Sequence, residues 1–314
     1  MASESLRLAR KAIPALGLLL VLALSGGCRA DEPNAPAGTS QFAKEVAREK
    51  YSQTEPPTVA PVFRWDFSKE KVWTYTYEQQ VRNTADMGSG FGGGPQSTGH
   101  EMSAKGSLLV KSKGDGTANL VLKDMRLSVK LAAGDAAPET MEQTMPPFVV
   151  QGMKEDGSGS FGDTSQDTLL KMLFPLPGKA LKVGDSVSIP AQMPFNAMGS
   201  PLYAKGRSRI TLTRYVKIGQ RTCAQLDVDT DISELKVPSE LKGEYACSAK
   251  GTSAFYFDVI DRSFVSGTVA MVMQFSIDAP TPKVEIPGED TSKMPTRLKM
   301  AMISDNLVRV RLEE

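Results

Sequence analysis

The most regular feature of this 314-residue chain is a two-residue alternation of apolar and polar positions. Trp73, Tyr75 and Tyr77 alternate with threonines, and the same pattern returns later in the chain. Successive side chains of an extended strand point to opposite faces, so this alternation predicts half-buried β-strands. Three later stretches share the pattern: 269–278, 297–303 and 307–312. The last two are expected to form two strands joined by a turn.

A short repeat indicates how the strands are connected. The sequence Ala-Lys-Gly occurs at residues 104–106, 204–206 and 249–251, and each copy opens a segment that reads as strand, turn, strand. The first turn, Gly114-Asp115-Gly116, is a strong hairpin signal. The other two turns are expected at 218–220 and 261–263. The sequence therefore predicts a mainly β, antiparallel, hairpin-rich fold: a curved sheet, sandwich or half-barrel with one or two short helices.

Composition divides the chain into three regions. Residues 28–60 are rich in Ala, Pro, Ser, Thr and charge, with a short helical pattern near 41–51, and are expected to be a flexible tether. Residues 61–314 are expected to be one antiparallel β domain, with related halves at about 61–177 and 178–314. A second short helix is expected after the capping sequence at 163–166 and before Pro175.

The first 27 residues have the organisation of a secretory signal. Basic residues precede an apolar core at 15–24, which is too short to span a bilayer, and Leu24-Ser25-Gly26-Gly27-Cys28 follows. These residues resemble a bacterial lipoprotein signal. The resemblance implies that residues 1–27 are removed and that acyl chains on Cys28 anchor the protein to a membrane, where two or more chains hold firmly. Arg29 after the cysteine favours the outer membrane, with the protein facing the periplasm or the cell surface. Ordinary secretion and an uncleaved anchor are the alternatives.

The body of the chain resembles an uncharacterised family of bacterial envelope lipoproteins with long antiparallel sheets. The resemblance implies a fold and no activity. It covers about residues 61 to 285 and is carried by four stretches: Phe174-Pro175-Leu176-Pro177, Leu181 to Ser186, Cys223-Ala224-Gln225-Leu226 and Ala254 to Asp258. More loosely, a curved sheet with an apolar concave face resembles the lipoprotein-carrier half-barrels of the periplasm, a likeness of fold that transfers function poorly.

Charge and cysteine content narrow the classes of partner. Without residues 1–27 the chain has 34 basic and 35 acidic residues, which gives no electrostatic basis for binding nucleic acid. With Cys28 assigned to lipid, Cys223 and Cys247 remain, an even pair in an oxidising compartment. A disulfide between them is therefore expected, with two buried thiols as the alternative.

The sequence offers no convincing catalytic or metal site, so the protein is expected not to be an enzyme and to need no cofactor or metal. His100 is the only histidine, and it follows a glycine-rich stretch, which predicts an exposed loop residue. Asp227, Asp229 and Asp231 alternate along a predicted strand. A straight strand does not converge six to eight oxygens on one calcium ion, so a solvated strand face is the preferred interpretation.

Two groups of residues are candidates for ligand binding. Both can equally be ordinary core, because methionine fills gaps as readily as it lines adaptable grooves, and aromatic side chains do both as well. Two hypotheses follow: a module that binds a lipid, an acyl chain or an apolar peptide on a curved sheet, or a structural or assembly component of the envelope that acts through protein contacts. The candidates are Trp73, Tyr75 and Tyr77, and Met271, Met273, Met300 and Met302.

Overall fold

The fold is described from a computed structural model, which covers residues 38–46, 50–86, 97–131, 139–159, 171–197, 200–280 and 296–313. Cys28, the signal-like segment and the glycine-rich stretch lie outside these residues, as does the predicted start of the second helix. Lys171 to Leu173 are helical and the helix ends before Pro175, where the sequence predicts its end.

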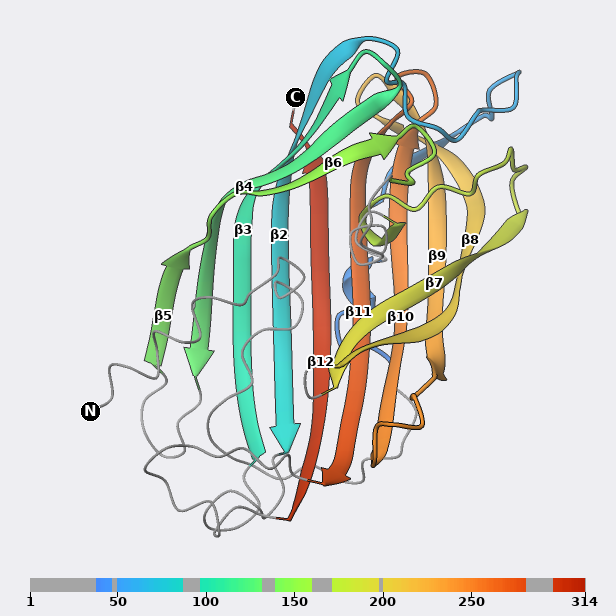
Figure 1. The fold of residues 1–314 in the computed structure, drawn as a ribbon. Helices are drawn as coiled ribbons and strands as arrows, with labels where there is room; N and C mark the ends of the chain where they lie inside the picture. The colour runs from blue at the N-terminus through green and yellow to red at the C-terminus, as the bar shows by residue number, and fades with distance from the viewer. Residues whose placement is uncertain are drawn as a thin grey trace.

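The described residues form one 12-stranded antiparallel sheet that is curved and unclosed (Figure 1). This confirms the predicted fold class. The strands are β1 Ser52–Thr54, β2 Glu70–Asp86, β3 Ser97–Lys113, β4 Thr117–Leu131, β5 Glu139–Thr144, β6 Phe148–Lys154, β7 Ser186–Ala197, β8 Ser200–Ile218, β9 Arg221–Leu235, β10 Glu244–Asp258, β11 Ser263–Pro280 and β12 Arg297–Leu312, and helix α2 is Ala43–Val46. Among the described residues, no helix has the length and apolar character needed to cross a membrane.

Two meanders, β2 to β6 and β7 to β12, make up the sheet. They are joined where β12 pairs with β2, so the path runs β8-β9-β10-β11-β12-β2-β3-β4. Strands β1 and β7 lie along β8 at one edge, and β5 and β6 lie along β4 at the other. The three predicted hairpins are confirmed as β3–β4, β8–β9 and β10–β11.

Glycines of the Ala-Lys-Gly repeat lie where neighbouring backbones come close. The pairing of β3 with β4 shifts register next to Gly106, and that of β8 with β9 shifts at Gly206. A Cβ on Gly206 would overlap the carbonyl oxygen of Asp231, and a Cβ on Gly106 would lie 2.8 Å from the carbonyl oxygen of Lys123. Such bulges bend and twist a sheet. The first two copies of the repeat therefore lie at sites where the sheet bends.

The prediction of two strands after residue 296 is wrong. Strand β12 is continuous, and Ser304, Asp305 and Asn306 lie within it although they are a typical turn sequence. All three are buried, with exposures of 1%, 6% and 3%. Polar groups in such positions need hydrogen-bond partners, and Asp305 obtains its partners from the N-terminal segment.

That segment, residues 38–46 and 50–54, is termed the strap because it lies across the outer face of the sheet. Ser40 donates through its hydroxyl to Asp305, and the backbone N–H of Gln41 donates to the other carboxylate oxygen at 2.8 Å. Helix α2 contacts β10 and β11, and β1 pairs with β8. The described part of the predicted tether is therefore packed against the domain, and its helix is shorter than the pattern suggested.

The opposite face, termed the inner face, carries Trp73, Tyr75 and Tyr77 and holds the main hydrophobic core. In Figure 1 both ends of the sheet curl toward the viewer, and β6 and β7 cross in front of the central strands. Segments 61–68 and 171–185 contribute Phe63, Trp65, Phe67, Phe174 and Leu181 to this core. The curved sheet thus encloses its own apolar filling at the end where β2 begins.

Candidate binding site on the inner face

The predicted aromatic stripe belongs to the packed end of the inner face. Trp73, Tyr75 and Tyr77 are at most 6% exposed. The ring of Trp65 lies 5.5 Å from that of Trp73 and 5.2 Å from that of Phe174. These three candidate residues therefore have the core role that the sequence left open, and they offer no open platform.

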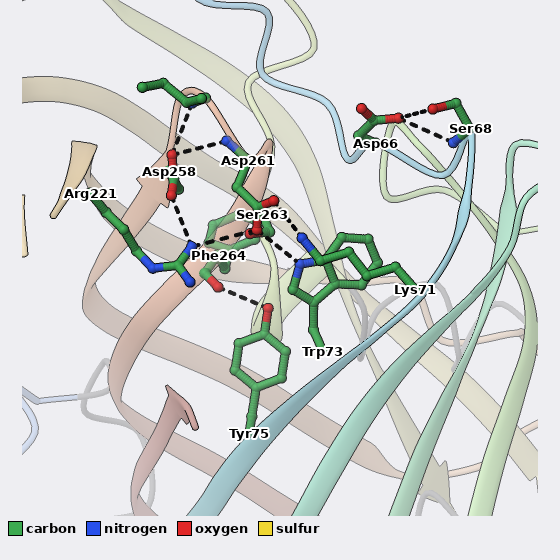
Figure 2. A network of polar contacts seen from close by, with 11 residues as sticks. Asp66, Ser68, Lys71, Trp73, Tyr75, Arg221, Asp258, Asp261, Ser263 and Phe264 are labelled. Atoms are coloured by element: carbon green, nitrogen blue, oxygen red, sulfur yellow. Dashed lines mark hydrogen bonds and ion pairs between the residues drawn. The ribbon is translucent and has the colours of Figure 1, made fainter. Parts of the chain in front are cut away.

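Hydrogen bonds to the β10–β11 turn hold two of these aromatic residues in place (Figure 2). The indole N–H of Trp73 donates to Asp261 at 3.3 Å, and the hydroxyl of Tyr75 donates to the carbonyl oxygen of Phe264 at 2.8 Å. Burial raises the pKa of Tyr75 well above its usual value. The phenol therefore stays protonated and serves as a fixed donor.

The carboxylates of the same turn are occupied by protein donors. Asp258 accepts from the backbone N–H groups of Ile260 and Asp261 and from Arg221 at 3.0 Å (Figure 2). Burial opposes ionisation of Asp261, but hydrogen bonds from Lys71 and Ser263 outweigh it and hold its pKa below the usual value. This network fixes the conformation of the turn between β10 and β11.

The four candidate methionines share the inner face further along the strands. In the β11–β12 register, Met271 and Met273 lie opposite Asn306 and Ser304, while Met300 lies opposite Ile277. Directly opposite residues of antiparallel strands project on the same side, with Cβ atoms roughly 5 Å apart. Met271, Met273 and Met302 are buried and Met300 is partly buried. The structure therefore brings the methionines together as one apolar strip, which lies further along the strands than the aromatic stripe but is continuous with the same hydrophobic core.

A polar group that sequence reasoning missed lies beside this strip. Asn83 of β2 is directly opposite His100 of β3 and Ser304 of β12, so the three form a row across adjacent strands. Asn306 lies opposite Val81, diagonal to Asn83, and Gln79 is further along β2 on the same face. We term Gln79, Asn83, His100, Ser304 and Asn306 the polar row.

Several atoms of the polar row are buried without a hydrogen-bond partner. They are Nε2 of Gln79, Oδ1 of Asn83, Nδ1 of His100 and Oδ1 of Asn306. Gln79, His100 and Asn306 are 1%, 5% and 3% exposed. A buried polar group left unpaired costs about 1–3 kcal/mol. A concentration of such atoms on one face is therefore a marker of a functional site.

The expectation that His100 is an exposed loop residue is wrong, because His100 is a buried residue of β3. Burial lowers its pKa, so the ring is neutral at pH 7. The alternation of His100, Met102 and Ala104 was the available signal. The glycines before it obscured the start of the strand.

The predicted disulfide between Cys223 and Cys247 is wrong, since both are free and buried. Cys223 lies opposite Asp258, eleven residues along β10 from Cys247, which corresponds to about 36 Å at the rise of a strand. A disulfide needs Cα atoms within about 7 Å. The two thiols also face opposite sides: Cys223 packs in an outer cluster with Tyr256, and Cys247 belongs to the inner core. An even cysteine count says nothing of this geometry.

The acidic stripe of β9 lies on the outer face and is paired across the sheet. Asp229 is opposite Arg209, and Asp231 is opposite both Arg207 and Lys250. Opposite charges in such cross-strand positions stabilise a sheet modestly. These five side chains and residues 38–40 and 43 of the strap line a cavity of about 420 Å³. The part of the chain that is described contains no cluster of three or more metal-ligating side chains.

Comparisons with known proteins give little further guidance. No protein-family model and no curated protein matches the chain. Among solved structures, a DUF1329 family protein from Desulfovibrio piger is 14% identical, over 74% of this chain and 83% of that chain, with a TM-score of 0.12. An acetoacetate decarboxylase-like enzyme from Sphingomonas wittichii is 10% identical, over 77% and 93%, with a TM-score of 0.13. The enduracididine biosynthesis enzyme MppR, complexed with pyruvate, is 10% identical, over 78% and 91%, with a TM-score of 0.10. TM-scores this low support no transfer of function.

Proposed function

We propose that this protein is a lipid-anchored component of the cell envelope that binds an apolar ligand on the inner face of its sheet. The ligand class is a lipid, an acyl chain or an apolar peptide segment. The observation that carries the proposal is the methionine strip beside the polar row, further along the strands than the aromatic stripe. Flexible, polarisable methionine side chains adapt to apolar ligands of varied shape.

The proposed anchor is supported by the signal-like sequence that ends at Cys28 and by the position of the strap. Gly38, where the described structure begins, is ten positions after Cys28. Ten extended residues span at most about 35 Å. An acylated Cys28 would therefore hold the sheet close to the membrane surface, within reach of lipids. The mutation Cys28→Ser tests the anchor: acyl labelling should disappear, and unchanged labelling would contradict it.

Ligand binding is tested by placing a bulky side chain on the methionine strip of the full-length protein. Met302 faces the strip, while Ile303, the next residue of β12, points outward and is 36% exposed. In the Met302→Trp variant, lipid that co-purifies with the protein should fall at least several-fold by mass spectrometry of the extract. The matched Ile303→Trp variant should retain it.

The same two variants separate a binding groove from a filled core. If the strip is a groove, Met302→Trp loses ligand with little change in stability. If the strip is filled core, no lipid is present in the wild-type protein, and overpacking costs about 1–3 kcal/mol. That second result would refute the proposed function. It would favour the structural or assembly hypothesis, which crosslinking of envelope partners would then test.

A further inference from the structure

The polar row has a chemistry of its own within an otherwise apolar face. Its unpartnered atoms include both a hydrogen-bond donor and acceptors: Nε2 of Gln79 is a donor, and the Oδ1 atoms of Asn83 and Asn306 are acceptors. The orientation of Asn306 is fixed, because its Nδ2 donates to the carbonyl and hydroxyl oxygens of Ser304 at 3.2 and 3.0 Å. The hydroxyl of Tyr77 donates to Oε1 of Gln79 at 3.1 Å, which leaves the amino group of Gln79 free.

The polar row carries no formal charge at neutral pH. Its members are amides, a hydroxyl and a histidine that burial keeps neutral. On the same face, its cross-strand neighbours are Val81, Met102, Met271, Met273 and Met302. A charged group placed among these residues would lose its hydration without gaining a counter-ion, which is strongly unfavourable. An uncharged group with donors and acceptors would satisfy the free atoms.

We propose that the polar row is a specificity site for the uncharged polar end of an amphipathic ligand, whose chain lies on the methionine strip. This inference rests on the proposed function and specifies its ligand. The polar end must offer hydroxyl or N–H donors to Asn83 and Asn306 and a carbonyl acceptor to Gln79. A monoacylglycerol has this set of groups, and a free fatty acid in its ionised form does not.

The geometry of the sheet supports a single, compact head-group site. Asn83 is directly opposite Ser304 and His100, which places their Cβ atoms roughly 5 Å apart, and Asn306 is diagonal to it at roughly 7–8 Å. One glycerol-sized group can reach several of these side chains at once. Met273 lies opposite Ser304 and Met271 opposite Asn306, so the apolar strip begins at the edge of this site.

Three probes that share an eighteen-carbon acyl chain test the inference on the full-length protein after removal of co-purified lipid. The probes are monoolein, methyl oleate, which lacks donors, and sodium oleate, which is charged. Monoolein should bind at least tenfold more tightly than the other two, measured by native mass spectrometry or calorimetry. Equal binding of all three would overturn the head-group inference while leaving the proposed function standing. Failure of all three to bind would contradict both this inference and the lipid form of the proposed function.

The variant Asn83→Leu identifies the residues responsible. It should reduce the preference for monoolein over methyl oleate about five- to tenfold, as loss of a hydrogen bond to a buried partner does. It should also raise the thermal midpoint of the ligand-free protein, because an unsatisfied buried acceptor is removed. The control is Thr84→Leu on the exposed outer face of the same strand, which should leave the preference unchanged.

A second variant, Asn306→Leu, keeps the test decisive if Asn83→Leu does not fold. It too should lower the preference for monoolein. A preference that stays the same in the folded variant would mean that the free atoms of the polar row are satisfied by something other than the ligand, such as a buried water molecule, and would overturn the inference.

Discussion

Removal of the Asp305 carboxylate should release the strap from the sheet. Asp305 is 6% exposed and accepts hydrogen bonds from the Ser40 hydroxyl and the Gln41 backbone N–H, and the Ser40 oxygen in turn accepts from the backbone N–H of Phe42 at 3.1 Å. Hydrogen bonds to a charged acceptor contribute about 1.5–3 kcal/mol each. The two bonds together set an upper range of about 3–6 kcal/mol for the variant Asp305→Ala.

The measured loss should be smaller than this range, at about 2–4 kcal/mol. Once the strap lifts, Ser40 and Gln41 regain hydrogen bonds to water, so the loss cannot exceed the free energy with which the strap docks. That docking also includes Phe42, which packs with Ala270 and Leu307, and the ion pair of Glu45 with Arg309 at 2.8 Å.

Urea unfolding followed by tryptophan fluorescence measures this loss, because both tryptophans of the chain are buried in the core. Hydrogen exchange of the strap shows whether the segment has detached. The control is Glu78→Ala, which removes a surface ion pair with Lys105 and should change stability by no more than about 0.5 kcal/mol. A loss below about 0.5 kcal/mol for Asp305→Ala, with unchanged exchange in the strap, would refute the assignment of Asp305 as the anchor point.

Three further predictions concern single positions. Gly206→Ala should lower the free energy of unfolding by about 3 kcal/mol in urea, because the added Cβ would overlap the backbone. The control Gly99→Ala has open space around its Cβ and should leave stability unchanged. Equal effects of the two variants would contradict the bulge argument. Burial raises the pKa of both Cys223 and Cys247 to about 12, so these thiols should not react with a thiol reagent at pH 8 in the native protein, and both should react in denaturant without reductant. The pKa of His100 is lower in the folded protein than in the unfolded chain, so the unfolded chain takes up a proton at a higher pH. The free energy of unfolding should therefore fall as the pH drops below about 6.5. The variant His100→Gln should abolish that part of the loss.

The strands could be predicted from the sequence because one face of the sheet is dry. The alternation around Tyr75 follows directly from burial on one side, and the hairpin turns carry glycine or polar residues. Strand β11 is buried on both faces around Met273, because the strap covers its outer face. Contacts between distant segments could not be predicted in the same way. Ser304 to Asn306 read as a turn because nothing local reveals that Ser40, 265 residues away, supplies the partner of Asp305.

The candidate site was only half predictable for a similar reason. The methionine strip follows from alternation within β11 and β12. The polar row is formed by β2, β3 and β12, and only the pairing of the first long strand with the last brings Asn83 beside Ser304. The predicted disulfide failed on the same point, because cysteine counting carries no information about which strand positions lie opposite each other.

The pairing of β2 with β12 also determines when the sheet can be completed. Tyr75 lies opposite Leu312, so the middle of the sheet is completed only when β12, which follows all the other described strands in the sequence, has been synthesised. Until then, β2 presents an unpaired edge of the kind that invites wrong pairing and aggregation. Native contacts of such long sequence separation also slow folding. A chain truncated before residue 297 should therefore remain as two unjoined meanders. A chaperone that shields the β2 edge during synthesis would have a large effect on the yield of folded protein.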